Sequence, residues 1–175
     1  MKSKRIVTVM SLVLLAVILA AGPAWGRKPG PTIVEVVIDL NSSGDYAGMF
    51  DTLIEAIGSA DPIVGETLSG NGQFTVFGPT DDAFLDIGQD PNTIGDLDQE
   101  VLTDILLYHV ARGRRYSEDV LDSEKIRMLN REFLLQDEGT LTDNLGREAD
   151  IIVLDVEAAN GIIHAINRVV LPKAP

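Results

Sequence analysis

The 175-residue sequence contains no cysteine and only two histidines, and its aromatic residues make up just 5% of the chain. The absence of cysteine excludes disulfides, thiol catalysis, cysteine-based metal sites and a lipid anchor on an N-terminal cysteine. A domain without disulfides is held together by its hydrophobic core, and a chain of this length is long enough to bury one. Since 45% of the residues are hydrophobic, the composition predicts one globular domain stabilised by burial.

Positive charge is also scarce, because 27 acidic residues stand against 14 lysines and arginines and the formal net charge is −13. Such a surface repels the phosphates of nucleic acids and disfavours adsorption to anionic lipid. We therefore expect no nucleic acid as a partner, and contact with a membrane only through a leader peptide or another protein. An acidic coat is typical of a solvated surface, although it also leaves cation-dependent association open.

The one long hydrophobic run lies at the N-terminus. Three cations precede an apolar stretch at 6–21, and the small residues Ala24 and Gly26 follow it. This order predicts a secretory signal peptide, 1–26, cleaved after Gly26. The stretch is shorter than the roughly 20 residues that cross a bilayer, so an uncleaved anchor is the weaker interpretation. We expect a periplasmic or secreted protein with a flexible lead-in at 27–31, whose net charge without the leader is about −16.

Patterns near the start of the mature chain predict two helices. Thr32 and Glu35 have the spacing of a capping box, and the apolar residues at 33–40 recur at helical intervals. Asp45 is expected to cap a second helix, which Gly58 ends.

A strand and two further helices are expected before residue 110. The apolar run at 74–77 predicts a compact strand. Thr80 and Asp81 follow it, and their side-chain oxygens can satisfy the free amides of a short helix that buries Phe84. The segment 99–108 has the apolar stripe of an amphipathic helix.

The second half of the sequence changes to strand-like patterns separated by turn residues. Asn160 and Gly161 are expected to supply the positive-φ positions of a tight hairpin. Because helices come first and a series of short strands follows, the order favours an α+β fold, an antiparallel β-sandwich or wedge with N-terminal helices packed on it. The expected strands lie at 126–129, 132–135, 140–142, 151–156, 162–165 and 168–171.

Three segments together resemble the signatures of the fasciclin domain family. They are FTVFGPTDDAF at 74–84, the pair Tyr108–His109 at the end of an apolar helix, and NGIIHAIN at 160–167, which VVLP follows. Their order and spacing match those of a secreted, bacterial-like member with a single domain. The resemblance covers 32–172 and leaves 173–175 as a C-terminal tail.

The resemblance implies a non-catalytic adhesion or matrix-interaction module, without a cofactor and monomeric, that binds a protein or polysaccharide of the cell surface or matrix. In animal members two places are associated with receptor binding, and these fall on Tyr108 with His109 and on Asp155 with Val156. The remaining signature residues are expected to define the fold, since buried polar groups with fixed partners specify a core. They are Thr80, Asp81, Phe84, Asn160, Gly161 and His164.

A hydrolase is the enzymatic alternative, and it would have to use His109 or His164 as its base. The sequence has no Gly-x-Ser-x-Gly motif, and both histidines stand among apolar neighbours. We therefore expect both rings to be partly buried and hydrogen-bonded to the backbone. Zinc is disfavoured, because the two histidines do not have the spacing of a ligand pair.

A second alternative is a periplasmic protein that binds a small molecule or calcium. Asp39, Asn41, Ser43 and Asp45 have the alternating spacing of the first half of a calcium loop. The twelfth position is Phe50, where such a loop needs a bidentate glutamate. The pattern therefore favours a plain turn between two helices.

Overall fold

The computed structural model describes residues 30–173. The expected signal peptide at 1–26 lies outside the described residues, as do 27–29 of the lead-in and 174–175 of the tail. Between residues 30 and 173, no helix has both the length and the apolar character needed to span a bilayer.

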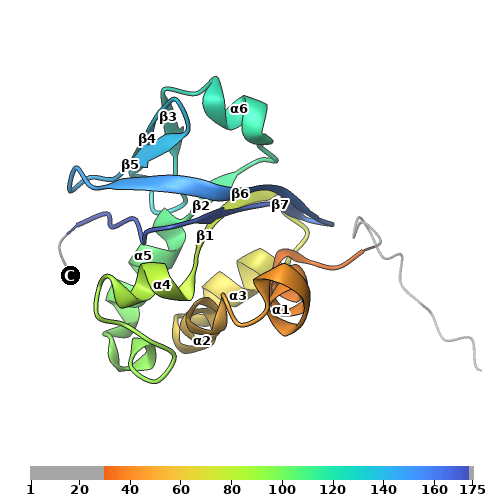
Figure 1. Cartoon of the computed structure of the whole chain (residues 1–175), viewed down its shortest axis with the longest axis vertical. Helices are drawn as coiled ribbons and strands as arrows, with labels where there is room; N and C mark the ends of the chain where they lie inside the picture. The colour runs from red at the N-terminus through yellow and green to blue at the C-terminus, as the bar shows by residue number, and fades with distance from the viewer. Residues whose placement is uncertain (1–29, 174–175) are drawn as a thin grey trace, which may run out of the picture.

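The first half of the described chain is mostly helical and contains a single strand, β1 (Figure 1). Helix α1 begins at the predicted capping box, in which Thr32 caps the helix and Glu35 reaches back to it. In chain order the elements are α1 (Ile33–Ser42), the 3₁₀ helix η1 (Gly44–Tyr46), α2 (Asp51–Ser59), α3 (Pro62–Ser69), β1 (Phe74–Pro79), α4 (Asp81–Leu85), the 3₁₀ helix η2 (Ile94–Asp96) and α5 (Gln99–Tyr108).

The second half supplies the other strands of a seven-stranded sheet in the order β2-β1-β7-β6-β5-β4-β3. All pairings are antiparallel except the one between β1 and β7, which is parallel. The elements are β2 (Val110–Arg112), α6 (Ser117–Leu121), β3 (Lys125–Arg127), β4 (Phe133–Asp137), β5 (Thr140–Thr142), β6 (Glu148–Ala158) and β7 (Gly161–Ile166).

The helices of the first half pack on one side of the sheet, and this confirms the α+β class. In Figure 1, β6 and β7 run across the middle, with α1, α2 and α3 below them and with α6, β3 and β4 above. Two apolar clusters fill the interior, since the strands bury residues toward both layers. The first lies under the helices and includes Ile33, Leu53, Phe84, Leu106 and Ile163. The second lies under the short strands and includes Phe77, Tyr108, Ile126, Leu134 and Ile166.

The expected cap of the second helix is wrong. Asp45 lies in η1, and α2 begins at Asp51 after Phe50, whose side chain makes no capping hydrogen bond. The cap comes instead from Asp81 of α4, whose carboxylate accepts hydrogen bonds from the amides of Asp51 at 3.2 Å and Thr52 at 2.8 Å. This long-range cap joins two helices that are about 30 residues apart along the chain.

Besides the 3₁₀ helices η1 and η2, three elements were not predicted, and one predicted strand is absent. The pattern analysis missed α3, β2 and α6, of which α3 has a readable start in Asp61 followed by Pro62. The segment 168–171 forms no strand in the described chain, although its apolar residues are buried.

The Asn160–Gly161 turn forms where expected, but for a different reason. Gly161 pairs with Ala158 across the β6–β7 hairpin, and neither Asn160 nor Gly161 has a positive φ. A Cβ on Gly161 would collide with the carbonyl oxygen of Phe74 and the side chain of Ile33. The residue is therefore glycine because β1 and α1 approach it closely.

Candidate functional site

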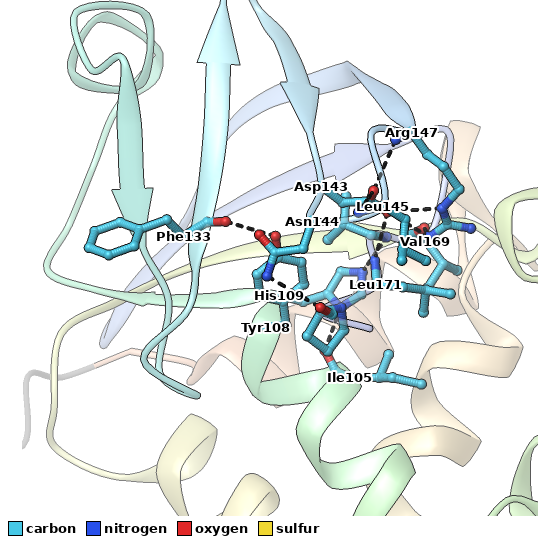
Figure 2. Close-up of polar contacts among 12 residues, drawn as sticks. Ile105, Tyr108, His109, Phe133, Asp143, Asn144, Leu145, Arg147, Val169 and Leu171 are labelled. Carbon is cyan, nitrogen blue, oxygen red and sulfur yellow. Dashed lines mark hydrogen bonds and ion pairs between the residues drawn. The ribbon is translucent and has the colours of Figure 1, made fainter. Parts of the chain in front are cut away.

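Tyr108 and His109 end α5 and lie inside the molecule (Figure 2). The Tyr108 hydroxyl donates a hydrogen bond to the carbonyl oxygen of Phe133 at 2.8 Å. Burial raises the pKa of Tyr108 to about 12. Both side chains are buried in this fold, and contact of this pair with a receptor stays a prediction.

The His109 ring joins two backbone groups from different parts of the chain. Nδ1 lies 2.8 Å from the carbonyl oxygen of Ile105, and Nε2 accepts a hydrogen bond from the amide of Val170 at 3.2 Å. Because Nε2 is the acceptor, the proton is on Nδ1, which donates to Ile105. Burial lowers the pKa of His109 to about 4, so the ring is neutral at physiological pH.

Asp143 and Arg147 extend this arrangement, and the sequence analysis did not identify either of them. The buried Asp143 carboxylate accepts hydrogen bonds from the Leu171 amide at 3.0 Å and from two Arg147 side-chain nitrogens at 2.9 and 2.7 Å. Arg147 also donates to the carbonyl oxygen of Val169 at 2.9 Å. Burial by itself raises the pKa of Asp143, but the hydrogen bonds from Leu171 and Arg147 outweigh it and lower that pKa.

These side chains hold segment 169–171 against the core, and we call this group the C-terminal clasp: His109, Asp143, Arg147 and residues 169–171. The segment belongs to no strand, yet its three side chains are buried. Backbone groups buried away from a sheet need other partners, and here the side chains of the clasp supply them. The signature VVLP is therefore an irregular segment that side-chain hydrogen bonds hold against the core (Figure 2).

The second histidine performs a similar task with the opposite tautomer. Nδ1 of the fully buried His164 accepts from the Asp155 amide at 3.3 Å, and Nε2 donates to the carbonyl oxygen of Arg115 at 3.0 Å. The ring stacks on Phe77 with 5.6 Å between the ring centroids. Burial lowers the pKa of His164, as it does for His109.

Asp155 lies at an irregularity in β6 and has a positive φ of 58°. Its carboxylate accepts hydrogen bonds from the Ser117 amide at 2.7 Å and from the Ser117 hydroxyl at 2.6 Å, so it caps α6. The side chain is 34% exposed. Val156 packs half-buried against the core.

The geometry does not assemble a serine hydrolase from these groups. The Ser117 hydroxyl donates to Asp155, whereas Nε2 of His164 is occupied by a backbone carbonyl. His109 is bonded separately, within the clasp. A triad needs a serine hydroxyl bonded to an imidazole nitrogen, and between residues 30 and 173 neither histidine has such a bond.

The calcium pattern does not form a loop. Helix α1 continues to Ser42, and Asp39 and Asn41, two residues apart on it, point in different directions. The Asn41 side chain accepts from the amide of Phe50 and donates to Asp51. Within the described part of the chain, no group of three or more histidines or carboxylates is placed to hold a metal ion.

The remaining signature residues have structural contacts. Thr80 caps α4, and Phe84 is a buried residue of that helix. The buried Asn160 side chain accepts from the amide of Ile33 at 2.8 Å and donates to the carbonyl oxygens of Leu68 at 2.7 Å and Gly70 at 3.0 Å. One amide group thus joins the start of α1 and the end of α3 to the β6–β7 hairpin.

Comparison with known proteins identifies the family of this fold. The family model of the Fasciclin domain matches residues 48–172. Protein sll1483 of Synechocystis is 36% identical over 144 residues, which cover 81% of this chain and 73% of that protein. The uncharacterized protein sll1735 of Synechocystis is 34% identical over 145 residues, which cover 81% of this chain and 98% of that protein. This chain belongs to the fasciclin domain family.

Longer proteins and a solved structure share the domain. Transforming growth factor-beta-induced protein ig-h3 of Sus scrofa is 33% identical over 135 residues, or 71% of this chain and 18% of that protein. The structure of a domain pair from the insect cell adhesion molecule Fasciclin I matches with a TM-score of 0.61 at 20% identity, over 81% of this chain and 51% of that chain. This likeness shows the fold, and the chain spans about half of the pair.

Proposed function

We propose that this protein is a non-catalytic module of the cell surface, matrix or envelope that binds a protein or polysaccharide partner outside the cytoplasm. The observation that carries the proposal is that both histidines serve as structural hydrogen-bonding groups. Each imidazole binds backbone groups through its two nitrogens and is buried, so neither is free to transfer protons to a substrate. The family also includes a protein described as a cell adhesion molecule.

The outer face of the sheet offers a surface for contact. Strands β4 and β6 alternate buried and exposed positions, and Phe133, Leu135, Ile152 and Leu154 are large apolar side chains on the exposed positions. Exposed apolar groups of this kind are typical of interaction surfaces. We propose that β6 near Leu154 and Asp155 contributes to partner binding, because Asp155 remains one-third exposed beside it.

The test compares two exposed leucines in the mature protein. Leu154→Ser lies on β6, whereas Leu85→Ser lies on α4, and the two residues are 53% and 57% exposed. Immobilised wild type and both variants are incubated with the native extracellular and envelope fraction, and bound protein and polysaccharide are quantified. We expect Leu154→Ser to lose at least about tenfold of the captured partner, and Leu85→Ser to retain it. Equal capture by both variants would show that β6 near Leu154 does not contribute to partner binding.

The enzymatic alternative has a separate test. The mature protein is incubated with a serine-directed fluorophosphonate probe, and labelling is measured by mass spectrometry. We expect no adduct at Ser117, because its hydroxyl is bonded to a carboxylate and not to an imidazole. A stoichiometric adduct that the native fold requires would overturn the non-catalytic assignment.

A further inference from the structure

Four arginines converge on one cavity in this strongly acidic protein. The cavity has a volume of about 420 Å³. It lies where β2, the loop that leads into α6 and the β3–β4 turn meet. A volume of this size accommodates a ligand as large as a monosaccharide with a charged substituent. The lining residues are Arg112, Arg115, Arg127, Met128, Leu129 and Arg131.

The tertiary fold brings these arginines together from separate segments. Ala111 of β2 forms an isolated bridge with Met128, and the Leu129 amide donates to the carbonyl oxygen of Val110 at 2.8 Å. These contacts place the end of β2 beside the end of β3. Arg131 has a φ of 79°, a conformation rare for a residue with a side chain, in the tight turn that leads to β4.

The positive charges in this cavity are not balanced by carboxylates. Among the residues that the structure describes, none of the four arginines forms an ion pair. Arg115 donates to the Ser123 hydroxyl at 3.4 Å, but its Nε is buried without any acceptor. Buried donors almost always have a partner in folded proteins, and this one has none within the described part of the chain.

We propose that this cavity, the arginine pocket, binds a compact phosphate ester such as the phosphate of a monosaccharide. Guanidinium groups bind phosphate oxygens through paired hydrogen bonds, and four of them complement a group with three terminal oxygens and nearly two negative charges. A single carboxylate has two oxygens and one charge, and it would leave most of the arginines without a partner.

The charge of the rest of the molecule favours a small ligand over a long polyanion. The chain carries 27 acidic residues, and a nucleic acid or a sulfated polysaccharide would extend from the pocket over surface that repels it. A compact ester places its charge inside the pocket alone. The arginine pocket is a separate site from the apolar surface of β4 and β6, so the two proposals can fail independently.

Calorimetric titration of the mature protein tests the proposal with glucose 6-phosphate, glucose 6-sulfate and glucose as probes. We expect glucose 6-phosphate to bind at millimolar concentration or below, glucose 6-sulfate to bind several-fold more weakly because it carries one charge, and glucose to give no heat. Sulfate binding as tight as phosphate binding would overturn the phosphate preference. No heat with either ester at about 10 mM would overturn the site itself.

Two matched variants show whether the pocket or the general charge is responsible. Arg127→Gln removes a lining cation, whereas Lys125→Gln removes an exposed cation two residues away on the same strand that does not line the cavity. We expect about tenfold weaker phosphate binding for Arg127→Gln and less than twofold for Lys125→Gln. Circular dichroism confirms that both variants are folded. Equal losses would mean that glucose 6-phosphate responds only to overall charge and would exclude the pocket.

Discussion

The two histidines of this protein act as connectors between distant backbone segments. His109 carries its proton on Nδ1 and accepts at Nε2, whereas His164 accepts at Nδ1 and donates from Nε2. Each tautomer is set by the backbone groups around the ring, because a neutral imidazole has one donor and one acceptor. Protonation would put a hydrogen on the acceptor nitrogen, which would then have no lone pair for the backbone N–H that faces it. The fold therefore keeps both rings neutral.

Stability at acidic pH tests this role for His109. The folded-state pKa is lowered from 6.5 to about 4, so the unfolded chain takes up a proton in this range that the folded chain does not. The free energy of unfolding is therefore unaffected above pH 6.5 and decreases as the pH falls toward 4, by up to about 3 kcal/mol. Urea denaturation at several pH values between 7.5 and 4.5 measures the decrease.

His109→Gln provides the control for this measurement. At pH 7.5 we expect it to be less stable than the wild type by about 1–3 kcal/mol, because a buried backbone group loses its partner. Glutamine does not titrate, so the difference between the two proteins should shrink as the pH approaches 4.5. The lowered pKa of His164 affects both proteins alike. A difference that stays constant with pH would show that His109 is not the titrating group.

At the scale of elements, long-range side-chain contacts replace several local caps. Helix α2 has no cap of its own and takes one from Asp81 on α4, and α6 is capped by Asp155 on β6. Asn160 joins α1 and α3 in the same way. The helices are thereby fastened to particular positions of the sheet, which fixes how the two layers lie against each other.

Asp81→Ala tests the contribution of one such contact. The substitution leaves two amides at the start of α2 without an acceptor, and we expect a loss of about 1 kcal/mol in the free energy of unfolding. Asp82→Ala is the matched control, since Asp82 is exposed, adjacent and on the same short helix. The urea midpoints of both variants measure the loss of stability. If Asp82→Ala costs as much as Asp81→Ala, helix α4 itself is the source and the cap contributes nothing.

At the scale of the whole molecule, the C-terminal clasp completes the second apolar cluster. Val170 belongs to this cluster together with Phe77 and Tyr108, and it arrives last along the chain. The clasp holds residues 169–171 in place through the side chain of His109, just after α5, and two side chains from the turn that precedes β6. The sheet and the helices therefore depend on a segment that belongs to no strand.

Removal of residues 168–175 tests this dependence. The deletion uncovers the core that Val169, Val170 and Leu171 bury, at a cost of about 1.5–3 kcal/mol for each side chain. The sum is comparable with the whole stability of a typical domain, about 5–15 kcal/mol. We expect amide hydrogen exchange to show loss of protection throughout β1, β6 and β7. Deletion of 173–175 alone, as control, should leave protection unchanged; protection retained in both proteins would contradict the role of the clasp.

The sequence by itself determined the elements that local signals mark clearly. The capping box at Thr32, the stripe at 99–108 and the Thr80 cap produced the expected helices, and the strand at 140–142 appears with the expected bounds. The order of helices and strands was sufficient for the α+β class. Local propensity and apolar spacing act within a few residues, so they are legible without the rest of the fold.

Only the tertiary structure decided which polar residues meet. Asp143 and Arg147 were not identified from the sequence, Asp81 looked like a local cap, and the arginines at 112–131 were spread over four segments. Their contacts join residues far apart along the chain, and no local pattern encodes such distances. Burial of the His109 ring was expected from its apolar neighbours, but its partner was decided by docking of the last strand-like segment, which brings the Val170 amide to the end of α5.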